Sequence, residues 1–238
     1  MPSLQGKLAI VTGASRGIGH ATAIALANRG ADVVLAGRDS ERLRAVEEAL
    51  PRGAVSLELD LSNLDSIGAF VEKIRARVAK VDVLVNCAGI YSRGTWEQSS
   101  APELENVFAT NVRGVFALTR ELLPLLVAAA GDVVFVNSSI VQFDGKGVGQ
   151  FAATQHALKA LADALRAEIN DKSVRVLSIF PGRTATPRQR RIHEMEGKPY
   201  RPERLLQPED VAQAIISSLE LADTAEVTDL RIRPRYKG

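Results

Sequence analysis

The sequence predicts a single doubly wound α/β domain, and three observations support this fold class. The chain has 238 residues, of which 46% are hydrophobic, and this suits one large domain with a substantial core. Short runs rich in Val, Ile and Leu alternate with longer segments of helical pattern. The short runs are apolar throughout, as expected of strands that are covered on both faces. We therefore expect a parallel sheet of about seven strands between two layers of helices.

The expected strands follow the apolar runs in chain order. They are Lys7–Thr12, Asp32–Gly37, Val55–Leu59, Val81–Asn86, Asp132–Ser138, Val174–Phe180 and Val227–Ile232. Capping residues, glycine and proline limit the helices expected between them. These helices are Gly17–Arg29, one capped by Asp39 that ends near Leu50 before Pro51, Ser62–Val78, Pro102–Ala130 with a kink at Pro124, Gln150–Asp171 and Pro208–Leu221.

Charge and composition exclude several function classes. The net charge is only +2, from 30 basic and 28 acidic residues, which argues against a nucleic-acid partner. The single cysteine, Cys87, excludes an intrachain disulfide and fits a reducing compartment. The first residues lack the pattern of a signal peptide, and the longest apolar run, Leu122–Ala130, is too short to span a membrane. We expect a cytoplasmic protein with no membrane partner and no metal site.

A glycine-rich loop, Thr12-Gly13-Ala14-Ser15-Arg16-Gly17-Ile18-Gly19, joins the first expected strand to the first expected helix. Glycines permit a tight turn and let backbone N–H groups approach a phosphate, which also meets the positive end of the helix. Ligands of doubly wound sheets bind beyond the carboxyl ends of the strands, where this loop lies. The loop therefore predicts a dinucleotide site. The alternative interpretation is an ordinary strand–helix turn.

The end of the second expected strand indicates which dinucleotide is bound. Sites that prefer NAD usually carry an acid there, which holds the ribose 2′-hydroxyl. This chain has Gly37 at that point, followed by Arg38. A guanidinium suits a 2′-phosphate, and Arg16 adds a second cation. We therefore expect NADP(H), the alternative being that Arg38 is a solvated loop residue.

Several motifs in the correct order make nearly the whole chain resemble the classical short-chain dehydrogenases/reductases, the SDR family. The loop Thr12–Gly19 resembles T-G-x-x-x-G-x-G, and Asn86-Cys87-Ala88-Gly89 resembles N-N-A-G with Cys87 in place of the second Asn. The resemblance implies a Rossmann-type fold, a small-molecule carbonyl or alcohol substrate, and a homodimer or homotetramer built on the two long helices. The expected cofactor-binding residues are Gly13, Ser15, Arg16, Gly17, Ile18, Gly19, Arg38, Asp60, Leu61, Asn86, Ala88, Gly89, Pro181, Gly182, Thr184 and Thr186.

The catalytic positions implied by the resemblance are only partly filled. Ser138 resembles the catalytic serine, and Asn111 resembles the asparagine that kinks the long helix and holds a water in a proton relay. The family's Tyr-x-x-x-Lys reads Phe151-Ala152-Ala153-Thr154-Gln155, with Phe151 lying 13 residues after Ser138. In the family the lysine stabilises the ionised phenol, which transfers the proton. Phe151 has no hydroxyl that could transfer a proton, and Gln155 has no charge that could stabilise an ionised phenol.

Possible substitutes for the missing acid are Lys159, Lys146, Asp144 and Tyr91, although a surface charge or a packing aromatic is the simpler interpretation of each. We expect His156 to face solvent or a neighbouring helix. Three interpretations stay open: a reductase scaffold that has lost its acid/base pair, a protein that senses or carries NADP(H) without turnover, and an enzyme of altered chemistry. A structural or interaction protein that merely retains the fold is a further alternative, against which the intact cofactor motifs weigh.

The segment 183–207 corresponds to the family's substrate lid, in which substrate identity is encoded. Its charges suggest either an anionic ligand or, as the favoured interpretation, a solvated helical face. They are Arg183, Arg188, Arg190, Arg191, Lys198, Arg201 and Arg204, against Glu194, Glu196 and Glu203.

Overall fold

The computed structural model describes residues 3–50, 54–143 and 145–236, and it confirms the predicted fold class. Seven strands in these residues form one parallel sheet in the order β3-β2-β1-β4-β5-β6-β7. Their bounds are β1 Leu8–Thr12, β2 Asp32–Gly37, β3 Ala54–Glu58, β4 Val83–Asn86, β5 Asp132–Val136, β6 Arg175–Pro181 and β7 Asp229–Ile232.

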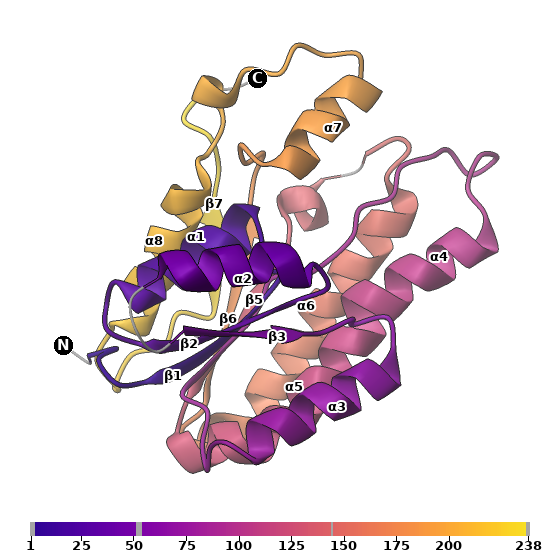
Figure 1. Cartoon of the computed structure of the whole chain (residues 1–238). Helices are drawn as coiled ribbons and strands as arrows, with labels where there is room; N and C mark the ends of the chain where they lie inside the picture. Colours follow the sequence, from indigo (N-terminus) through magenta and orange to yellow (C-terminus); the bar gives the residue numbers. More distant parts are fainter. Residues whose placement is uncertain (1–2, 51–53, 144, 237–238) are drawn as a thin grey trace.

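Helices cover both faces of this sheet (Figure 1). One face carries α1 (Gly17–Ala27), α2 (Ser40–Ala49) and α8 (Pro208–Leu219). The other carries α3 (Leu64–Arg75), α5 (Gly114–Ala129) and α6 (Gly149–Ile169). The remaining helices are α4 (Ala101–Phe108) and α7 (Pro187–Met195), with shorter helical turns η1 (Ala109–Arg113), η2 (Ser139–Gln142), η3 (Asn170–Lys172) and η4 (Pro202–Arg204). None of the helices in the described part of the chain has both the length and the apolar character to cross a membrane.

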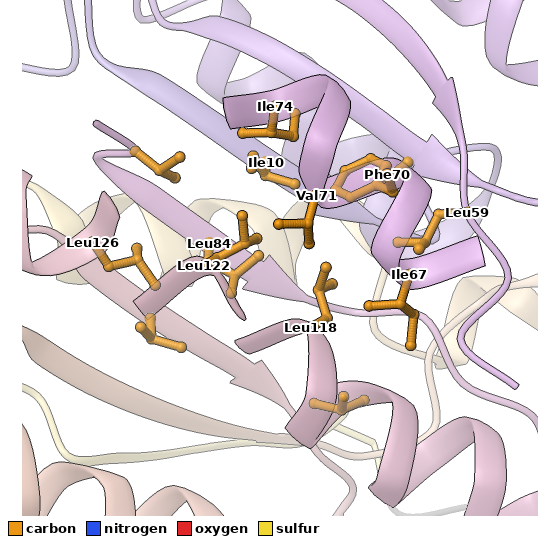
Figure 2. Packing of buried hydrophobic residues seen from close by; sticks show 14 of the residues in the cluster. Ile10, Leu59, Ile67, Phe70, Val71, Ile74, Leu84, Leu118, Leu122 and Leu126 are labelled. Carbon is orange, nitrogen blue, oxygen red and sulfur yellow. The ribbon is translucent and has the colours of Figure 1, made fainter. Parts of the chain in front are cut away.

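The strands are apolar throughout because each face packs against its own layer of helices. In β1, Ile10 points into the cluster that α3 and α5 complete, whereas Ala9 and Val11 point into the cluster completed by α1, α2 and α8. Figure 2 shows the first cluster, in which Ile10 and Leu84 from the strands gather with Phe70 of α3 and Leu122 of α5. Burying a side chain of this size contributes about 1.5–3 kcal/mol.

The strand order reverses at β1, which pairs with β2 on one edge and with β4 on the other. The connections that leave β1 and β4 therefore run to opposite faces of the sheet, and a crevice opens between them at the carboxyl ends. The chain returns to this same edge at the ends of β5 and β6. The fold thus brings together segments from along the whole sequence at one edge.

Some element bounds differ from those predicted, for local reasons. We predicted that Ser62 opens the third helix, but Asn63 caps it by accepting the backbone N–H groups of Asp65 at 2.8 Å and Ser66 at 3.3 Å. The single helix predicted over Pro102–Ala130 is α4 and α5 separated by a wider π-helical turn, η1, which contains Asn111. The segment 183–207 contains one further helix, α7, which Thr186 caps by accepting the N–H of Gln189.

Candidate active site

A cleft of about 940 Å³ lies at the carboxyl ends of the strands, where the strand order reverses. The structure brings nearly all of the predicted site residues to it. The predicted residues that line the cleft are Gly13, Ser15, Arg16, Gly17, Ile18, Gly19, Arg38, Asp60, Leu61, Ala88, Gly89, Asn111, Ser138, Phe151, Gln155, Pro181, Gly182, Thr184 and Thr186.

The glycine-rich loop needs its glycines for two physical reasons. Gly13 and Gly17 have φ angles of +69° and +61°, which disfavour any residue with a Cβ. A Cβ on Gly19 would lie 2.4 Å from the carbonyl oxygen of Gly13. Thr12 ties the start of the loop to the segment that follows β4. Its Oγ1 accepts the N–H groups of Cys87 at 2.9 Å and Ala88 at 3.0 Å. The outcome is a rigid backbone cradle at the start of α1.

The electrostatics of this end of the cleft favour an anion. The first turn of α1 carries no acidic residue, so nothing within the helix offsets the positive end of its dipole. Arg16 and Arg38 are exposed at the cleft, and within the described residues neither forms an ion pair with a carboxylate. Asp60 is engaged by its neighbour Ser62, whose N–H and Oγ donate to Asp60 Oδ1 at 2.9 and 2.8 Å. A cradle of backbone N–H groups with unpaired cations beside it fits the phosphates of a dinucleotide.

The structure does not bring Asn86 to the cleft. Its side chain is buried, with only 2% exposed, and its Nδ2 donates to Thr119 Oγ1 of α5 at 3.1 Å. The next residue, Cys87, does line the cleft. Burial raises the pKa of the Cys87 thiol to about 12, although the charge of Arg188 and the backbone N–H of Gly19 lower it. Asn86 thus supports the end of β4 beneath the site, and Cys87 is a neutral thiol within it.

The opposite end of the cleft holds the candidate catalytic residues. Ser138 follows β5 and opens η2, and its Oγ accepts the N–H of Ile140 at 3.2 Å. This bond uses an acceptor site and leaves the hydroxyl proton free to donate. Asn137, which sequence reasoning did not single out, donates its Nδ2 to the carbonyl of Gln155 at 3.0 Å. It thereby fixes α6 against β5.

Phe151 and Gln155 lie one helical turn apart on α6, and both line the cleft. Gln155 Nε2 donates to Thr154 Oγ1 at 3.3 Å, and Thr154 Oγ1 donates to the carbonyl of Phe151 at 2.7 Å. Asn111 Nδ2 donates to the same Thr154 oxygen at 3.2 Å. None of these four side chains is ionisable near neutral pH.

The substitutes considered for the missing acid divide into two groups. Lys159 is outside the cleft lining and forms an ion pair with Asp163 at 2.6 Å, His156 is exposed as expected, and Asp144 lies outside the described residues. Lys146 and Tyr91 do line the cleft.

Tyr91 is positioned by its neighbours. Its ring packs on Phe151 with centroids 4.9 Å apart, and its hydroxyl oxygen accepts Nη1 of Arg93 at 3.5 Å. Tyr91 therefore presents the phenol that lies beside the predicted catalytic position.

The segment 183–207 is not only a solvated face. Arg183, Arg188 and Glu196 line the cleft, whereas Arg190 is exposed and lies 5.3 Å from the ring of Tyr200. Glu196 accepts from Arg183 Nη2 at 2.8 Å and pairs with Arg93, far away in the sequence, at 3.4 Å.

The carboxylate of Glu196 holds this segment against the loop that follows β4. Burial raises the pKa of Glu196, but hydrogen bonds from Arg183 and Lys198 lower it more, so the net shift is downward. No local signal could have identified Arg93, because its partner lies across the cleft.

No cluster of three or more side chains suited to a metal ion occurs in the described ranges. The cleft instead combines a phosphate cradle, unpaired arginines and a polar end with Ser138. These residues fit a dinucleotide, with its phosphates at the glycine-rich loop and its far end toward Ser138 and Phe151.

Known proteins resemble this chain in sequence and in fold. A family model described as short chain dehydrogenase matches residues 7–197. Glycine betaine reductase ATRR of Emericella nidulans is 31% identical over 241 residues, which cover 98% of this chain but only 19% of that much longer protein. An NADP-dependent 3-hydroxy acid dehydrogenase of Schizosaccharomyces pombe is 30% identical over 250 residues, covering 100% of this chain and 96% of its own length.

A similar solved structure is 3-ketoacyl-(acyl-carrier-protein) reductase from Brucella melitensis, complexed with NADH. It is 28% identical to this chain and superposes with a TM-score of 0.87, covering 97% of this chain and 98% of that one. Of the last two proteins, one is named as NADP-dependent and the other was solved with NADH.

Proposed function

The chain belongs to the short-chain dehydrogenase family, and from that premise we propose that it binds NADP(H) and is an oxidoreductase scaffold with impaired proton transfer. The observation that carries the cofactor proposal is the pair of unpaired arginines, Arg16 and Arg38, beside the glycine-rich loop. Gly37 ends β2 at the position where an acid would select NAD, and Arg38 follows it directly. A 2′-phosphate there offers both guanidinium groups a charge-assisted partner.

In this proposal, different residues of the chain bind different parts of the dinucleotide. The loop around Gly13 and Gly17 holds the pyrophosphate through backbone N–H groups, and Asp60 with Leu61 borders the adenine. Pro181, Gly182, Thr184 and Thr186 border the nicotinamide end, with Ala88 and Gly89 opposite. The bound cofactor would supply a hydride to a carbonyl carbon, or accept one from an alcohol.

In this proposal, the site lacks the pair of residues that transfers the proton. We assign Phe151 and Gln155 to the positions of the family's acid/base tyrosine and lysine. Ser138 can polarise a carbonyl by donating its hydroxyl proton in a hydrogen bond, but a serine hydroxyl alone is a poor proton donor. General acid–base catalysis contributes about 10²–10⁴-fold, so we expect turnover to be slower by a factor of that order.

A second candidate function is a sensor or carrier that binds NADP(H) without turnover. The observation that favours it is the network of Asn111, Thr154 and Gln155, in which the three hydrogen bonds described above join groups that do not ionise. Such a network keeps α6 rigid beside the cofactor while it offers no route for a proton.

One experiment separates these functions. NADPH and NADH are titrated into the purified chain by fluorescence, and NADPH oxidation is then followed with a panel of aldehydes, ketones and 3-oxo esters. Tighter binding of NADPH with slow oxidation supports the oxidoreductase, and binding with no oxidation supports the sensor. Binding of neither dinucleotide would overturn both and leave an interaction protein that retains the fold.

Three further features are part of the proposal. The segment 183–207 acts as the substrate lid, the protein is cytoplasmic, and it is a homodimer or homotetramer. Exposed apolar side chains on the helices next to the cleft support self-association, among them Phe116 on α5, which is 50% exposed. Size-exclusion chromatography with light scattering measures the assembly directly, and a monomer would contradict it.

A further inference from the structure

Arg188 crosses the cleft. It lies in the first turn of α7, just after the capping residue Thr186, and its Nη2 donates to the carbonyl oxygen of Gly89 on the opposite wall. Much of its side chain is exposed, but its guanidinium lies among the residues that line the cleft. It therefore links the start of the 183–207 segment to the loop that follows β4.

The charged neighbour of the Arg188 guanidinium is another cation. Enclosure by protein lowers the pKa of Arg188, and the charge of Arg16, at the start of α1, lowers it further. The other neighbour is the Cys87 thiol, which is held neutral by burial and receives the N–H of Gly19. Among the residues that the structure describes, no carboxylate forms an ion pair with Arg188 or Arg16. Two guanidinium groups thus repel each other across the glycine-rich loop.

An anion between these two groups would remove the repulsion. The backbone N–H groups of the loop and the N-terminus of α1 already favour phosphate at this point. Arg188 approaches from the other side, from α7, so an anion bound there would be enclosed by two walls of the cleft.

We propose that Arg188 is a ligand of the cofactor's pyrophosphate and that this contact holds α7 closed over the bound dinucleotide. The inference rests on the proposed function, because it requires a dinucleotide in the cleft. It assigns to Arg188 a role different from that of Arg38. The pyrophosphate is common to NAD and NADP, whereas the 2′-phosphate is present in NADP alone.

The test is the affinity of the apo-protein for both dinucleotides. NADPH and NADH are titrated by fluorescence into the unaltered chain, Arg188→Gln, Arg188→Lys and the matched control Arg190→Gln, which changes an exposed arginine on the same helix. Loss of a charge-assisted bond to phosphate should weaken binding about 10- to 100-fold. We expect Arg188→Gln to weaken NADPH and NADH by the same factor, Arg188→Lys to restore part of the loss, and Arg190→Gln to change neither.

Hydrogen exchange of the amides of α7 gives a second readout that does not depend on turnover. Saturating NADPH should slow exchange over residues 187–195 in the unaltered chain, but not in Arg188→Gln at equal occupancy. Circular dichroism confirms that each variant is folded.

The outcomes separate the two proposals. Unchanged or tighter binding by Arg188→Gln would overturn this one, and tighter binding would mean that the arginine merely obstructs the cleft. A loss confined to NADPH would also overturn it, because it would place Arg188 at the 2′-phosphate. If the unaltered chain binds neither dinucleotide, the proposed function fails first and this inference fails with it.

Discussion

The phenyl ring of Phe151 packs against the phenol ring of Tyr91, with centroids 4.9 Å apart and planes inclined at 58°. Both rings line the cleft, and Ile140 and Val148 close the apolar cluster beneath Phe151. The only phenol at this end of the described cleft is therefore on the loop that follows β4 and not on α6.

Restoring the acid/base pair is the first prediction. Because Phe151 and Gln155 already line the cleft one turn apart, Phe151→Tyr with Gln155→Lys should place a phenol and an ammonium there without changing the backbone. We expect carbonyl reduction by NADPH to rise by about 10²–10⁴-fold, the usual contribution of general acid–base catalysis. The measurement is NADPH oxidation with the panel of carbonyl compounds described above.

Each single change serves as a control for the double variant. Phe151→Tyr alone has no cation beside its phenol, and Gln155→Lys alone has no acid, so each should recover much less activity than the pair. If the chain as it stands already turns over as fast as the double variant, the loss of proton transfer is disproved, and Tyr91 or Lys146 becomes the acid to test.

Arg38 provides the second prediction, on cofactor choice. Arg38→Ala removes a charge-assisted partner of the 2′-phosphate and should weaken NADPH about 10- to 100-fold while leaving NADH nearly unchanged. Arg42→Ala is the matched control, since Arg42 is a nearby exposed arginine that pairs with Asp39 at 3.2 Å. Calorimetric titration of each variant measures the ratio of the two affinities. Equal affinities of NADPH and NADH in the unaltered chain would eliminate the 2′-phosphate assignment.

The sequence was sufficient for the features that depend on local pattern. The glycine-rich loop, the apolar strands and the cap of Asp39 on α2 follow from neighbouring residues, and the structure has each of them. The contacts across the cleft could not be predicted. Glu196 meets Arg93, and Arg188 meets Gly89, through pairings about a hundred residues apart that only the packed fold creates.

Asn86 is a second feature whose position the sequence could not predict. Its place in a recognisable motif predicted a cofactor contact, but the motif does not tell which side of β4 each side chain takes. The structure turns Asn86 toward Thr119, and the neighbouring backbone of Ala88 and Gly89 lines the cleft instead.

Thr154 gives a prediction on stability. Its Oγ1 is fully buried and accepts the amide N–H groups of Asn111 and Gln155 at 3.2 and 3.3 Å. Thr154→Val keeps the shape but leaves these buried donors without that acceptor, at a cost of about 1–3 kcal/mol in the free energy of unfolding. Urea denaturation measures the loss. Thr154→Ser retains the hydroxyl and should cost less, so the opposite order of the two variants would show that the methyl group and not the network matters.

The last prediction concerns the chemistry of Cys87. Burial raises its pKa to about 12 from an ordinary value of 9.0, against the lowering effect of Arg188. A shift of three units makes the thiolate about 10³-fold scarcer at pH 8, and the thiolate is the reactive form. Because the pKa is raised, reactivity should increase about tenfold with each pH unit up to 12 and should never level off at neutral pH. Arg188→Gln removes a stabilising charge and should slow the reaction further.

Absorbance during reaction with a disulfide reagent such as dithiobis(nitrobenzoate) measures this rate, and Cys87 is the chain's single cysteine, so no other thiol contributes. The same chain unfolded in urea is the internal control, and it should react at least 10³-fold faster at pH 8 because its thiol has the ordinary pKa. A folded chain that reacts as fast as the unfolded one would show that Cys87 is open to water and that burial does not raise its pKa.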